Sequence, residues 1–392
     1  MTNMKQKKIL AVTGIRSEYD IIYPVLKELQ ESDNFDLKVV VTGAHLSDWH
    51  GFTVNKIRED GFEIVDQIDY LLMTNRKTQR SKGIGLLIEG LTQTVERVEP
   101  DFLIFVGDRE ESIATCVVGN YMDVLVAHIG GGDPVYGNSD DPIRMSCSKL
   151  AHIHFAFADE YAKNIEKLGE EKYRICCSGN PALNNLIETK VLDRKVLSKY
   201  LDMDVENSDY IVVLKHPLSS EMQDSYDQMR IAMEAVSEFS TNNKMKVVGI
   251  YPNTDPGSYD ILKAIDENSD ENIRFYKTLD REIFVNLMRN ARALVGNSSM
   301  GILEAPLYKL PVVNIGNRQK GRLNAGNVEF VNYNKQEIVN SISKACFDND
   351  YRDCVLNLDN PYGDGFAHKK IVGFLDSVDT NDKKWHIKKK LV

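Results

Sequence analysis

Short apolar runs alternate with segments of helical spacing along most of the chain, and this alternation predicts the fold class. The runs are continuously apolar, as expected of strands that are buried on both faces of a parallel sheet. Strand and helix alternating in this way indicate an α/β protein with parallel, doubly wound sheets. The predicted strands are Lys8–Thr13, Asp36–Thr42, Phe62–Ile68, Phe102–Val106, Val124–Ile129, His154–Ala158, Arg174–Cys177, Tyr210–Leu214, Met245–Tyr251, Ile273–Tyr276, Ala293–Val295 and Pro311–Ile315.

Glycine or a polar residue follows most of these strands, so the strand ends provide turns into the helices. The sequence pattern predicts no helix or strand over residues 323–359. The predicted helices are Glu18–Gln30, Thr53–Glu59, Gly83–Val98, Glu111–Met122, Ile143–Ala151, Tyr161–Leu168, Gln228–Phe239, Tyr259–Ile265, Ile283–Asn290, Met300–Leu307 and Phe366–Leu375.

The alternation is interrupted between Pro181 and Ser208, where apolar runs thin out and charged residues accumulate. A chain of 392 residues also exceeds what one hydrophobic core usually supports. We expect a Rossmann-like domain over residues 1–180 that carries acid–base residues, and a nucleotide-binding Rossmann-like domain over residues 205–365. Residues 366–392 form a helix and a basic tail that return toward the first domain. Two such halves predict two doubly wound domains that face each other across a cleft.

Charge and cysteine content exclude several classes of function. The net charge of −10 argues against binding to nucleic acid or to an acidic membrane, so any phosphate site must be a local basic pocket. The six cysteines form no C-x-x-C pair and no metal-ligand spacing, which indicates reduced thiols. No apolar run is long enough to span a membrane, and the start of the chain does not resemble a signal peptide. We expect a cytoplasmic protein that needs neither a cofactor nor a metal.

The stretch from Ala293 to Arg322 has the pattern of a cradle for a nucleoside diphosphate. A strand is followed by a polar turn and then by a helix, whose first N–H groups have no intrahelical partner and attract anions. Glu304 follows in the predicted helix and suits the vicinal hydroxyls of a ribose. The alternative is an ordinary turn in which serine caps the helix. The candidate binding residues of the stretch are Asn297, Ser298, Ser299, Glu304, Arg318 and Arg322, with Lys320 beside them.

A set of acidic residues follows the strands of the first half. Asp108 and Asp133 come directly after buried strands beside glycines, and Asp140 and Asp141 lie a few residues further on. Acidic groups brought together can have their proton affinities separated, which acid–base catalysis requires. Each residue taken singly could instead be a solvated loop aspartate or a helix cap, and Asp141 before Pro142 suits a cap.

Other candidates lie where strands end. Arg16 could reach a diphosphate from the first strand, and His45 and His216 are placed for polar contacts, although a single histidine is more often structural. Gly257 and Ser258 form a turn that could approach a phosphate or a base. The HExxH, Walker and GxSxG motifs are absent, which excludes the zinc hydrolase, P-loop and α/β-hydrolase classes.

With these motifs the chain resembles the UDP-N-acetylglucosamine 2-epimerase family, and most closely its hydrolysing branch. That branch makes N-acetylmannosamine for sialic acid, or acts on related diacetamido sugars for legionaminic acid. The motifs occur in family order over nearly the whole chain. They are TGIRSEYD (Thr13–Asp20), VTGAH (Val41–His45), GDRE (Gly107–Glu110), HIGGGD (His128–Asp133), DDPIR (Asp140–Arg144), KHP (Lys215–Pro217), GNSSMGILE (Gly296–Glu304), NIGNRQKGR (Asn314–Arg322) and NPYGDG (Asn360–Gly365).

The resemblance implies the glycosyltransferase-B fold, a nucleotide-sugar substrate linked to UDP or GDP, and a homodimer or homotetramer. It also implies a two-step reaction, in which the nucleoside diphosphate is eliminated to give a glycal and water is then added. Asp108, Asp133, Asp140 or Asp141, with His45, would carry the acid–base steps, and the roles among them stay open. Residues implied to bind substrate are Arg16, Arg109, His216, Gly257, Ser258, Asn297, Ser298, Ser299, Glu304, Arg318 and Arg322.

Two positions depart from the family pattern. The family usually has glutamate where Asp133 stands and histidine where Met145 stands. These departures favour a modified sugar, so a UDP- or GDP-linked N,N'-diacetylbacillosamine is the alternative to UDP-N-acetylglucosamine. Remaining rivals are a glycosyltransferase of the same fold, a non-hydrolysing epimerase, and a nucleotide-sugar sensor without turnover.

Overall fold

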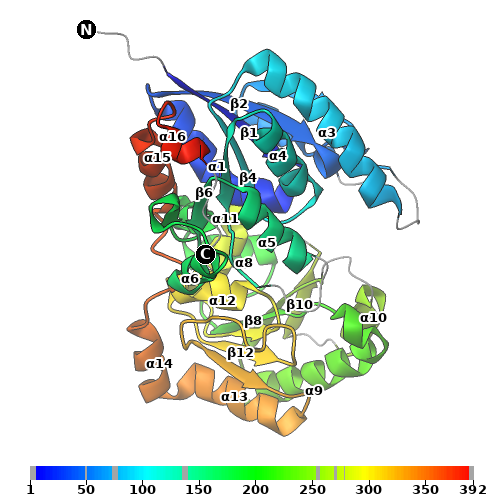
Figure 1. Cartoon of the computed structure of the whole chain (residues 1–392). Coiled ribbons are helices and arrows are strands. Elements are labelled where there is room, and N and C mark those ends of the chain that lie inside the picture. The colour runs from blue at the N-terminus through cyan, green and yellow to red at the C-terminus, as the bar shows by residue number, and fades with distance from the viewer. Residues whose placement is uncertain are drawn as a thin grey trace. The chain divides into compact units, whose positions relative to one another are not determined.

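The computed structural model divides the chain into two compact units (Figure 1). Unit 1 comprises Met1–Ile187 and Tyr362–Val392, and unit 2 comprises Glu188–Pro361. The structure describes residues 6–48, 51–72, 78–134, 140–252, 257–268, 272–277 and 279–387.

Unit 1 is built on a seven-stranded parallel sheet among its described residues, with the order β3-β2-β1-β4-β5-β6-β7. The side chains of β1 alternate between the two faces of this sheet. Leu10 and Val12 pack with Leu87 and Leu91 of α3 (Thr78–Val98) in one apolar core, so α3 and α4 (Glu110–Tyr121) cover that face. Its strands are β1 (Lys7–Thr13), β2 (Phe35–Thr42), β3 (Ile64–Ile68), β4 (Phe102–Val106), β5 (Leu125–Ile129), β6 (Ile153–Ala156) and β7 (Ile175–Cys177).

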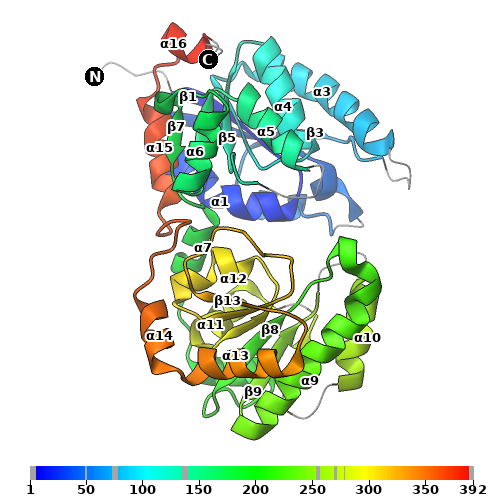
Figure 2. The same ribbon diagram turned by 60° about the horizontal axis from the view of Figure 1, so that its bottom comes forward.

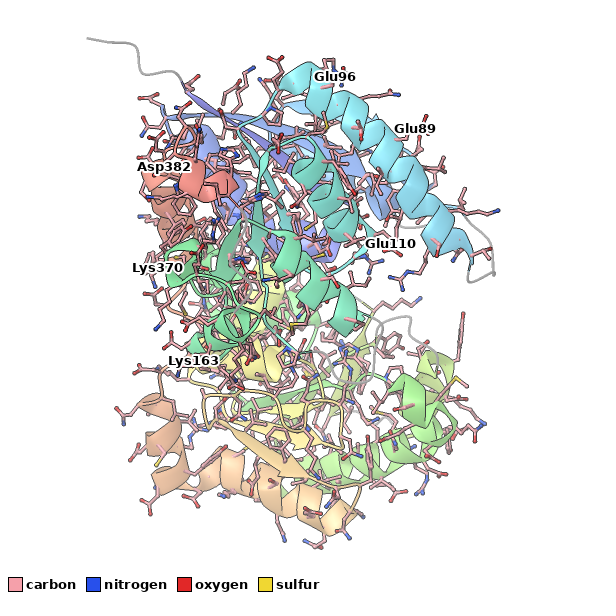
Figure 3. The ribbon with its side chains drawn as sticks, viewed as in Figure 1. Glu89, Glu96, Glu110, Lys163, Lys370 and Asp382 are labelled. Atoms are coloured by element: carbon pink, nitrogen blue, oxygen red, sulfur yellow. The ribbon has the colours of Figure 1, made fainter. Side chains whose placement is uncertain are left out.

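The helices of unit 1 show the sidedness that their sequence patterns predict. Glu89 and Glu96 lie on the outer side of α3 (Figure 3), opposite the apolar stripe that contains Leu87 and Leu91. The helices are α1 (Arg16–Glu31), η1 (Gly43–Leu46), α2 (Val54–Glu59), α3 (Thr78–Val98), α4 (Glu110–Tyr121), α5 (Asp140–Leu150), α6 (Asp159–Lys167), η3 (Lys172–Arg174), α7 (Ala182–Glu188), α15 (Ala367–Ser377) and α16 (Lys383–His386).

The C-terminal helices belong to unit 1 although they follow unit 2 in sequence. In Figures 1 and 2, α15 lies beside α1. Lys7 Nζ donates to the carbonyl oxygen of Leu375 at 3.2 Å, at the end of α15. Arg174 is fully buried and donates to the carbonyl oxygens of Trp385 and Ile387 at 3.0 and 2.9 Å. These contacts fix α16 to unit 1.

Unit 2 contains a second parallel sheet, with the order β10-β9-β8-β11-β12-β13. Figure 2 shows α9 and α13 side by side on one face of it. Ile211 and Val213 of β8 pack into the core on that face, and Val212 and Leu214 pack into the core on the other face. The strands are β8 (Tyr210–Leu214), β9 (Lys246–Ile250), β10 (Ile273–Tyr276), β11 (Leu294–Gly296), β12 (Val312–Ile315) and β13 (Val328–Val331). The helices are α8 (Arg194–Leu201), η4 (Ser219–Asp224), α9 (Ser225–Asn243), α10 (Ser258–Asn268), α11 (Arg281–Asn290), α12 (Met300–Leu303), η5 (Ala305–Tyr308), α13 (Lys335–Phe347) and α14 (Asn349–Leu356).

Two predictions about unit 2 are wrong. The helix predicted over Met300–Leu307 is a single α-turn, α12, followed by the 3₁₀ segment η5. Pro306 causes the break, because its ring displaces the backbone four residues earlier and it has no N–H to donate. Residues 323–359, for which the sequence pattern predicts no element, contain β13, α13 and α14. The start of α13 was readable, since the Asn334 side chain accepts from the Glu337 N–H at 3.0 Å as a helix cap.

Both sheets confirm the predicted parallel, doubly wound α/β class. In each sheet the chain starts in the middle, moves to one edge, and then returns to build the other side. The reversal lies between β1 and β4 in unit 1 and between β8 and β11 in unit 2. Sheets of this kind bind ligands outside the carboxyl ends of the strands at such switch points. Among the described residues, no helix is long and apolar enough to cross a membrane.

Candidate active site

Two aspartates of unit 1 share one arginine at the ends of neighbouring strands. Asp108 follows β4 and Asp133 follows β5, which pair in parallel. Arg144 of α5 forms an ion pair with Asp108, and its Nη1 lies 3.3 Å from Asp133 Oδ2 and 2.9 Å from the Asp133 carbonyl oxygen. Only 14, 12 and 11% of the side chains of Arg144, Asp108 and Asp133 are exposed. Arg144 supplies the positive charge that two adjacent buried carboxylates require.

A buried histidine holds the turn that carries Asp108. His128 of β5 stacks on Phe105, and its Nε2 lies 2.8 Å from the Gly107 carbonyl oxygen. Burial lowers the pKa of His128 to about 3, so the ring is neutral and donates to that carbonyl. Ser148 Oγ lies 3.3 Å from Nδ1 on the other side of the ring. The position of Asp108 therefore depends on β5 as well as on β4.

The two predicted arginines of unit 1 lie at the same switch point. Arg16 opens α1 after β1, and its side chain is 73% exposed beside Asp20 at 3.8 Å. Arg109 follows Asp108 and is exposed. Desolvation alone would lower the pKa of Arg109. The negative charges of Glu111, Glu18 and Glu110 outweigh this effect, so the pKa is raised. Both guanidinium groups lie at the edge of the sheet where a ligand is expected.

His45 is buried and contacts two hydroxyl groups. It is fully buried in η1, with Nε2 3.1 Å from Thr13 Oγ1 and Nδ1 2.7 Å from Thr53 Oγ1. Burial lowers the pKa of His45 to about 4. With both ring nitrogens engaged by hydroxyl groups, the ring fixes the turns after β1 and β2, and its predicted catalytic role stays a prediction.

Asp140 and Asp141 open α5, the helix that also carries Arg144. Their side chains lie outside the described part of the structure, so their predicted roles stay predictions. Because α5 already includes Asp141, this residue lies within the helix rather than capping it. Met145 follows Arg144 and is half-buried.

In unit 2 the ends of β8 and β11 are joined by one asparagine. Asn297 Oδ1 accepts from the His216 N–H at 2.7 Å, and Asn297 Nδ2 donates to the His216 carbonyl oxygen at 2.9 Å. Gly296 has φ 141°, and a Cβ there would lie 2.0 Å from the Leu214 carbonyl oxygen, so only glycine fits. The predicted binding residue Asn297 thus uses its amide to position His216.

The hydroxyl and acidic candidates of unit 2 follow this turn. Ser298 is buried and its Oγ accepts weakly from the Met300 N–H at 3.4 Å, while Ser299 is partly exposed. Glu304 is half-buried and lies near Tyr308, since its charge is among the causes that raise the pKa of Tyr308, after burial. The structure thus collects Ser298, Ser299 and Glu304 around α12.

The basic candidates after β12 reach back to the same turn. Arg318 Nη1 and Gln319 Nε2 each donate to the Asn297 carbonyl oxygen at 3.1 Å. Arg322 Nη1 in turn donates to Gln319 Oε1 at 2.9 Å. Arg318, Gln319 and Arg322 are therefore connected to the turn after β11, and the role of this turn as a nucleotide cradle stays a prediction.

Gly257 and Ser258 lie at the start of α10. Gly257 has φ 98°, and a Cβ there would lie 2.5 Å from Ser225 Oγ and 3.2 Å from Pro217 Cβ. The turn therefore packs directly against the loop that carries His216.

Sequence reasoning missed three residues of these sites. Arg144 was visible as the cation inside the acidic motif DDPIR, and Gln319 as the neutral residue between Arg318 and Lys320. Lys215 follows β8 and is 2% exposed; burial lowers its pKa to about 8. A lysine at the end of a fully buried strand was the available signal.

Among the described residues, no group of His, Cys, Asp and Glu side chains is arranged to hold a metal ion.

Strand order and polar switch points together define a two-domain α/β protein of the glycosyltransferase-B class. A solved structure with this fold is the UDP-N-acetylglucosamine 2-epimerase of Neisseria meningitidis bound to UDP-N-acetylglucosamine. It superposes with a TM-score of 0.77 at 21% identity, over 94% of this chain and 99% of that chain.

The family model described as UDP-N-acetylglucosamine 2-epimerase matches residues 27–376. The UDP-N,N'-diacetylbacillosamine 2-epimerase (hydrolyzing) of Legionella pneumophila is 30% identical, over 95% of this chain and 96% of that protein. The GDP/UDP-N,N'-diacetylbacillosamine 2-epimerase (hydrolyzing) of Campylobacter jejuni is also 30% identical, over 83% of this chain and 84% of that protein. The chain belongs to the UDP-N-acetylglucosamine 2-epimerase family. The family and enzyme type inferred from the motifs are confirmed, and both relatives support the hydrolysing branch.

Proposed function

We propose that the protein is a hydrolysing nucleotide-sugar 2-epimerase, which releases a nucleoside diphosphate and a free sugar inverted at C2. The observation that carries this proposal is the bridge of Arg144 between Asp108 and Asp133, at the ends of adjacent strands β4 and β5. Inversion at an unactivated carbon requires a proton to leave and another to return, and carboxyl groups at one place supply both.

The first step is an elimination. A carboxylate of the Asp108–Asp133 pair takes the proton from C2, and the C1–O bond breaks with its electrons leaving on the nucleoside diphosphate. Positive groups at the leaving phosphate stabilise this charge. Arg16 and Arg109 in unit 1, and His216, Ser298, Ser299 and Arg322 in unit 2, are the residues proposed for that role. Glu304 is proposed to accept from the ribose hydroxyls.

The second step hydrates the glycal. Water adds to C1 and a proton adds to C2 from the face opposite to the one that lost it. Asp140 and Asp141, on the same helix as Arg144, remain candidates for activating this water. The product is the 2-epimer as a free sugar.

We propose a UDP- or GDP-linked diacetamido sugar of the diacetylbacillosamine type as the preferred substrate, with UDP-N-acetylglucosamine second. The names of the two relatives support this choice, and so do the shorter Asp133 and the apolar Met145. The product would then serve legionaminic acid synthesis rather than sialic acid synthesis. A cytoplasmic location and a homodimer or homotetramer also remain proposals.

One experiment tests the reaction. The protein is incubated with a panel of UDP- and GDP-linked acetamido sugars in D₂O and in H₂¹⁸O, and the released sugar is analysed by NMR and mass spectrometry. We expect one deuterium at an inverted C2 and the oxygen label at C1. A sugar that keeps its original C2 hydrogen and configuration would exclude the epimerase and favour a glycosyltransferase or a simple hydrolase. A product that retains its nucleotide would indicate a non-hydrolysing epimerase.

A further inference from the structure

Three glycines of unit 1 leave room for two carboxyl groups at the switch point. Gly14, Gly43 and Gly107 follow β1, β2 and β4 directly. A Cβ at Gly14 or Gly43 would lie 1.6 or 2.5 Å from Glu111 Oε1, and a Cβ at Gly107 would lie 3.1 Å from Glu18 Oε1. The ends of the central strands are therefore shaped around the side chains of Glu18 and Glu111.

Glu111 is the inner member of this pair. It lies in the first turn of α4 and is 2% exposed. Its Oε1 accepts from the Tyr70 hydroxyl at 2.7 Å, but its Oε2 is buried without a hydrogen-bond partner among the described residues. A buried carboxyl oxygen without a donor is costly, so this atom requires a proton from a neighbour or from a ligand.

Glu18 is the outer member. It lies in the first turn of α1, two residues after the exposed Arg16, and the residue is half-buried. Removal from water and the charge of Glu111 raise the pKa of Glu18 well above its usual value, although Arg109 opposes them. The other charged groups that act on it are Asp108 and Glu110.

Glu110 is adjacent to Glu111 in the sequence, but its surroundings shift its pKa in the opposite direction. Glu110, labelled in Figure 3, precedes Glu111 in α4 and forms an ion pair with Arg80. Burial raises the pKa of Glu110, but the Arg80 hydrogen bond and charge leave it lowered. The pKa of Glu110 is thus lowered while the pKa of the adjacent Glu111 is raised, so these two neighbouring carboxyl groups differ in proton affinity.

We propose that Glu18 is the acid that delivers the proton to C2 in the hydration step, and that Glu111 is the positioning residue that keeps this proton on Glu18. The proposal rests on the proposed epimerase function. Glu111 itself is buried beneath Gly14 and Gly43, so Glu18, which is half-buried beside Gly107, is the member of the pair placed to reach a sugar.

The O–H bond of Glu18 breaks, and the electron pair of the C1–C2 double bond forms the new C2–H bond. The hydroxyl of a water molecule bonds to C1, and the other proton of that water passes to a carboxylate that did not take the first proton. This carboxylate is the second member of the Asp108–Asp133 pair, or it is Asp140 or Asp141. Glu18 then regains a proton from solvent. Over the whole reaction one proton is released with the nucleoside diphosphate.

The test separates the two half-reactions with Glu18→Gln, which keeps the shape of the side chain but has no acidic proton. We expect this variant still to release nucleoside diphosphate, while formation of epimerised sugar falls about 10²-fold or more and the glycal accumulates. Purified glycal supplied with nucleoside diphosphate should be hydrated by the wild type and not by the variant. The matched control is Glu110→Gln, which should keep the wild-type ratio of sugar to nucleotide.

Two results would overturn the proposal. One is a wild-type ratio of sugar to nucleotide in Glu18→Gln. The other is an equal fall of both products, which would place Glu18 before the elimination.

Glu111→Gln tests the positioning role, because it retains an acceptor for Tyr70 and removes the charge. We expect the alkaline limb of the turnover profile to move to lower pH, which a merely structural role would not cause. An unmoved limb would contradict the role of Glu111.

Infrared difference spectra provide a readout without turnover. At neutral pH, Glu18→Gln should lose a protonated-carboxyl band that the wild type and Glu110→Gln retain. Absence of that band from the wild type would overturn the proposal. A wild type that has the band but releases nucleotide from none of the sugars would instead show that the proposed function is wrong.

Discussion

Unit 1 and unit 2 share one type of sheet but fill the ends of their central strands differently. In unit 1 the ends of β1 and β4 carry carboxyl groups whose environments differ, including Glu18, Glu111 and Asp108. In unit 2 the ends of β8 and β11 carry backbone turns fixed by the amides of Asn297 and Gln319. The first arrangement suits proton transfer, and the second suits holding a ligand with fixed donors. The same topology therefore supports two different tasks, and the residues after each strand decide which.

The largest effect is expected on substitution of Arg144, because this residue pairs with both Asp108 and Asp133 in unit 1. Arg144→Met leaves Asp108 and Asp133 together without a cation, so we expect unit 1 to lose about 3–5 kcal/mol of stability. Urea unfolding followed by tryptophan emission measures this, because the buried Trp385 belongs to unit 1. Arg144→Lys keeps the charge and should recover most of the loss. Unchanged stability in Arg144→Met would mean that the two aspartates do not form a charged pair.

The second prediction separates chemistry from binding in unit 1. Asp108→Asn and Asp133→Asn keep the side-chain shape but cannot exchange a proton in the same way, so kcat should fall about 10²-fold or more. Affinity for the free nucleoside diphosphate, measured by calorimetry, should stay within about threefold of wild type, since neither aspartate is among the residues proposed to bind the nucleotide. Near-normal turnover in both variants would make the acidic set structural. Asp133→Glu restores the usual family residue and should shift the preference among the sugars of the panel.

In unit 2 we expect substitutions to weaken nucleotide binding more than they slow the reaction. If Glu304 and Ser298 bind the nucleotide as proposed, Glu304→Ala and Ser298→Ala should each remove one hydrogen bond to it, which costs roughly 1.5–3 kcal/mol, or one to two powers of ten in affinity. The rate of the bound reaction should change much less. Calorimetry that finds unchanged affinity for both UDP and GDP in both variants would remove α12 and its turn from the nucleotide site.

The sequence was sufficient for the class of fold because apolar runs such as Phe102–Val106 and Tyr210–Leu214 coincide with whole strands. The pattern fails around Pro306. The helical spacing of apolar residues extends beyond this proline, although a proline disrupts the interior of a helix. The pattern also fails at β13, whose first three residues are only partly buried and lack the continuous apolar signal. Hydrophobic spacing thus predicts buried elements well and edge elements poorly.

The candidate site residues likewise divide into those that the sequence predicts and those that only the tertiary structure reveals. Asp108 and Asp133 were predictable because each follows a buried strand, and strand ends meet at one edge of a sheet. Their link through Arg144 was not, since it depends on how α5 packs against β5. Glu111 was hidden for the same reason, because a glutamate in the first turn of a helix usually serves the helix dipole. Only the tertiary structure shows that it lies beneath Gly14 instead of in solvent.

The smallest expected effect concerns the pH dependence of stability in unit 1. Burial raises the pKa of Glu18 and of Glu111 in the folded protein above the usual value of 4.5. The folded state therefore retains protons that the unfolded chain releases above that pH, and stability falls as pH rises from about 4.5 through the folded values. Glu111→Gln removes one of these groups, so its urea midpoint by tryptophan emission should fall less steeply with pH. At pH 8 we expect the variant to be more stable than wild type by about 1 kcal/mol, the order of magnitude for relieving one unpartnered buried polar atom. Glu304→Gln in unit 2 is the matched control and should follow the wild-type slope. Identical slopes for Glu111→Gln and wild type would show that the carboxyl pair of unit 1 is not strained by burial, and would remove the difference between the two switch points.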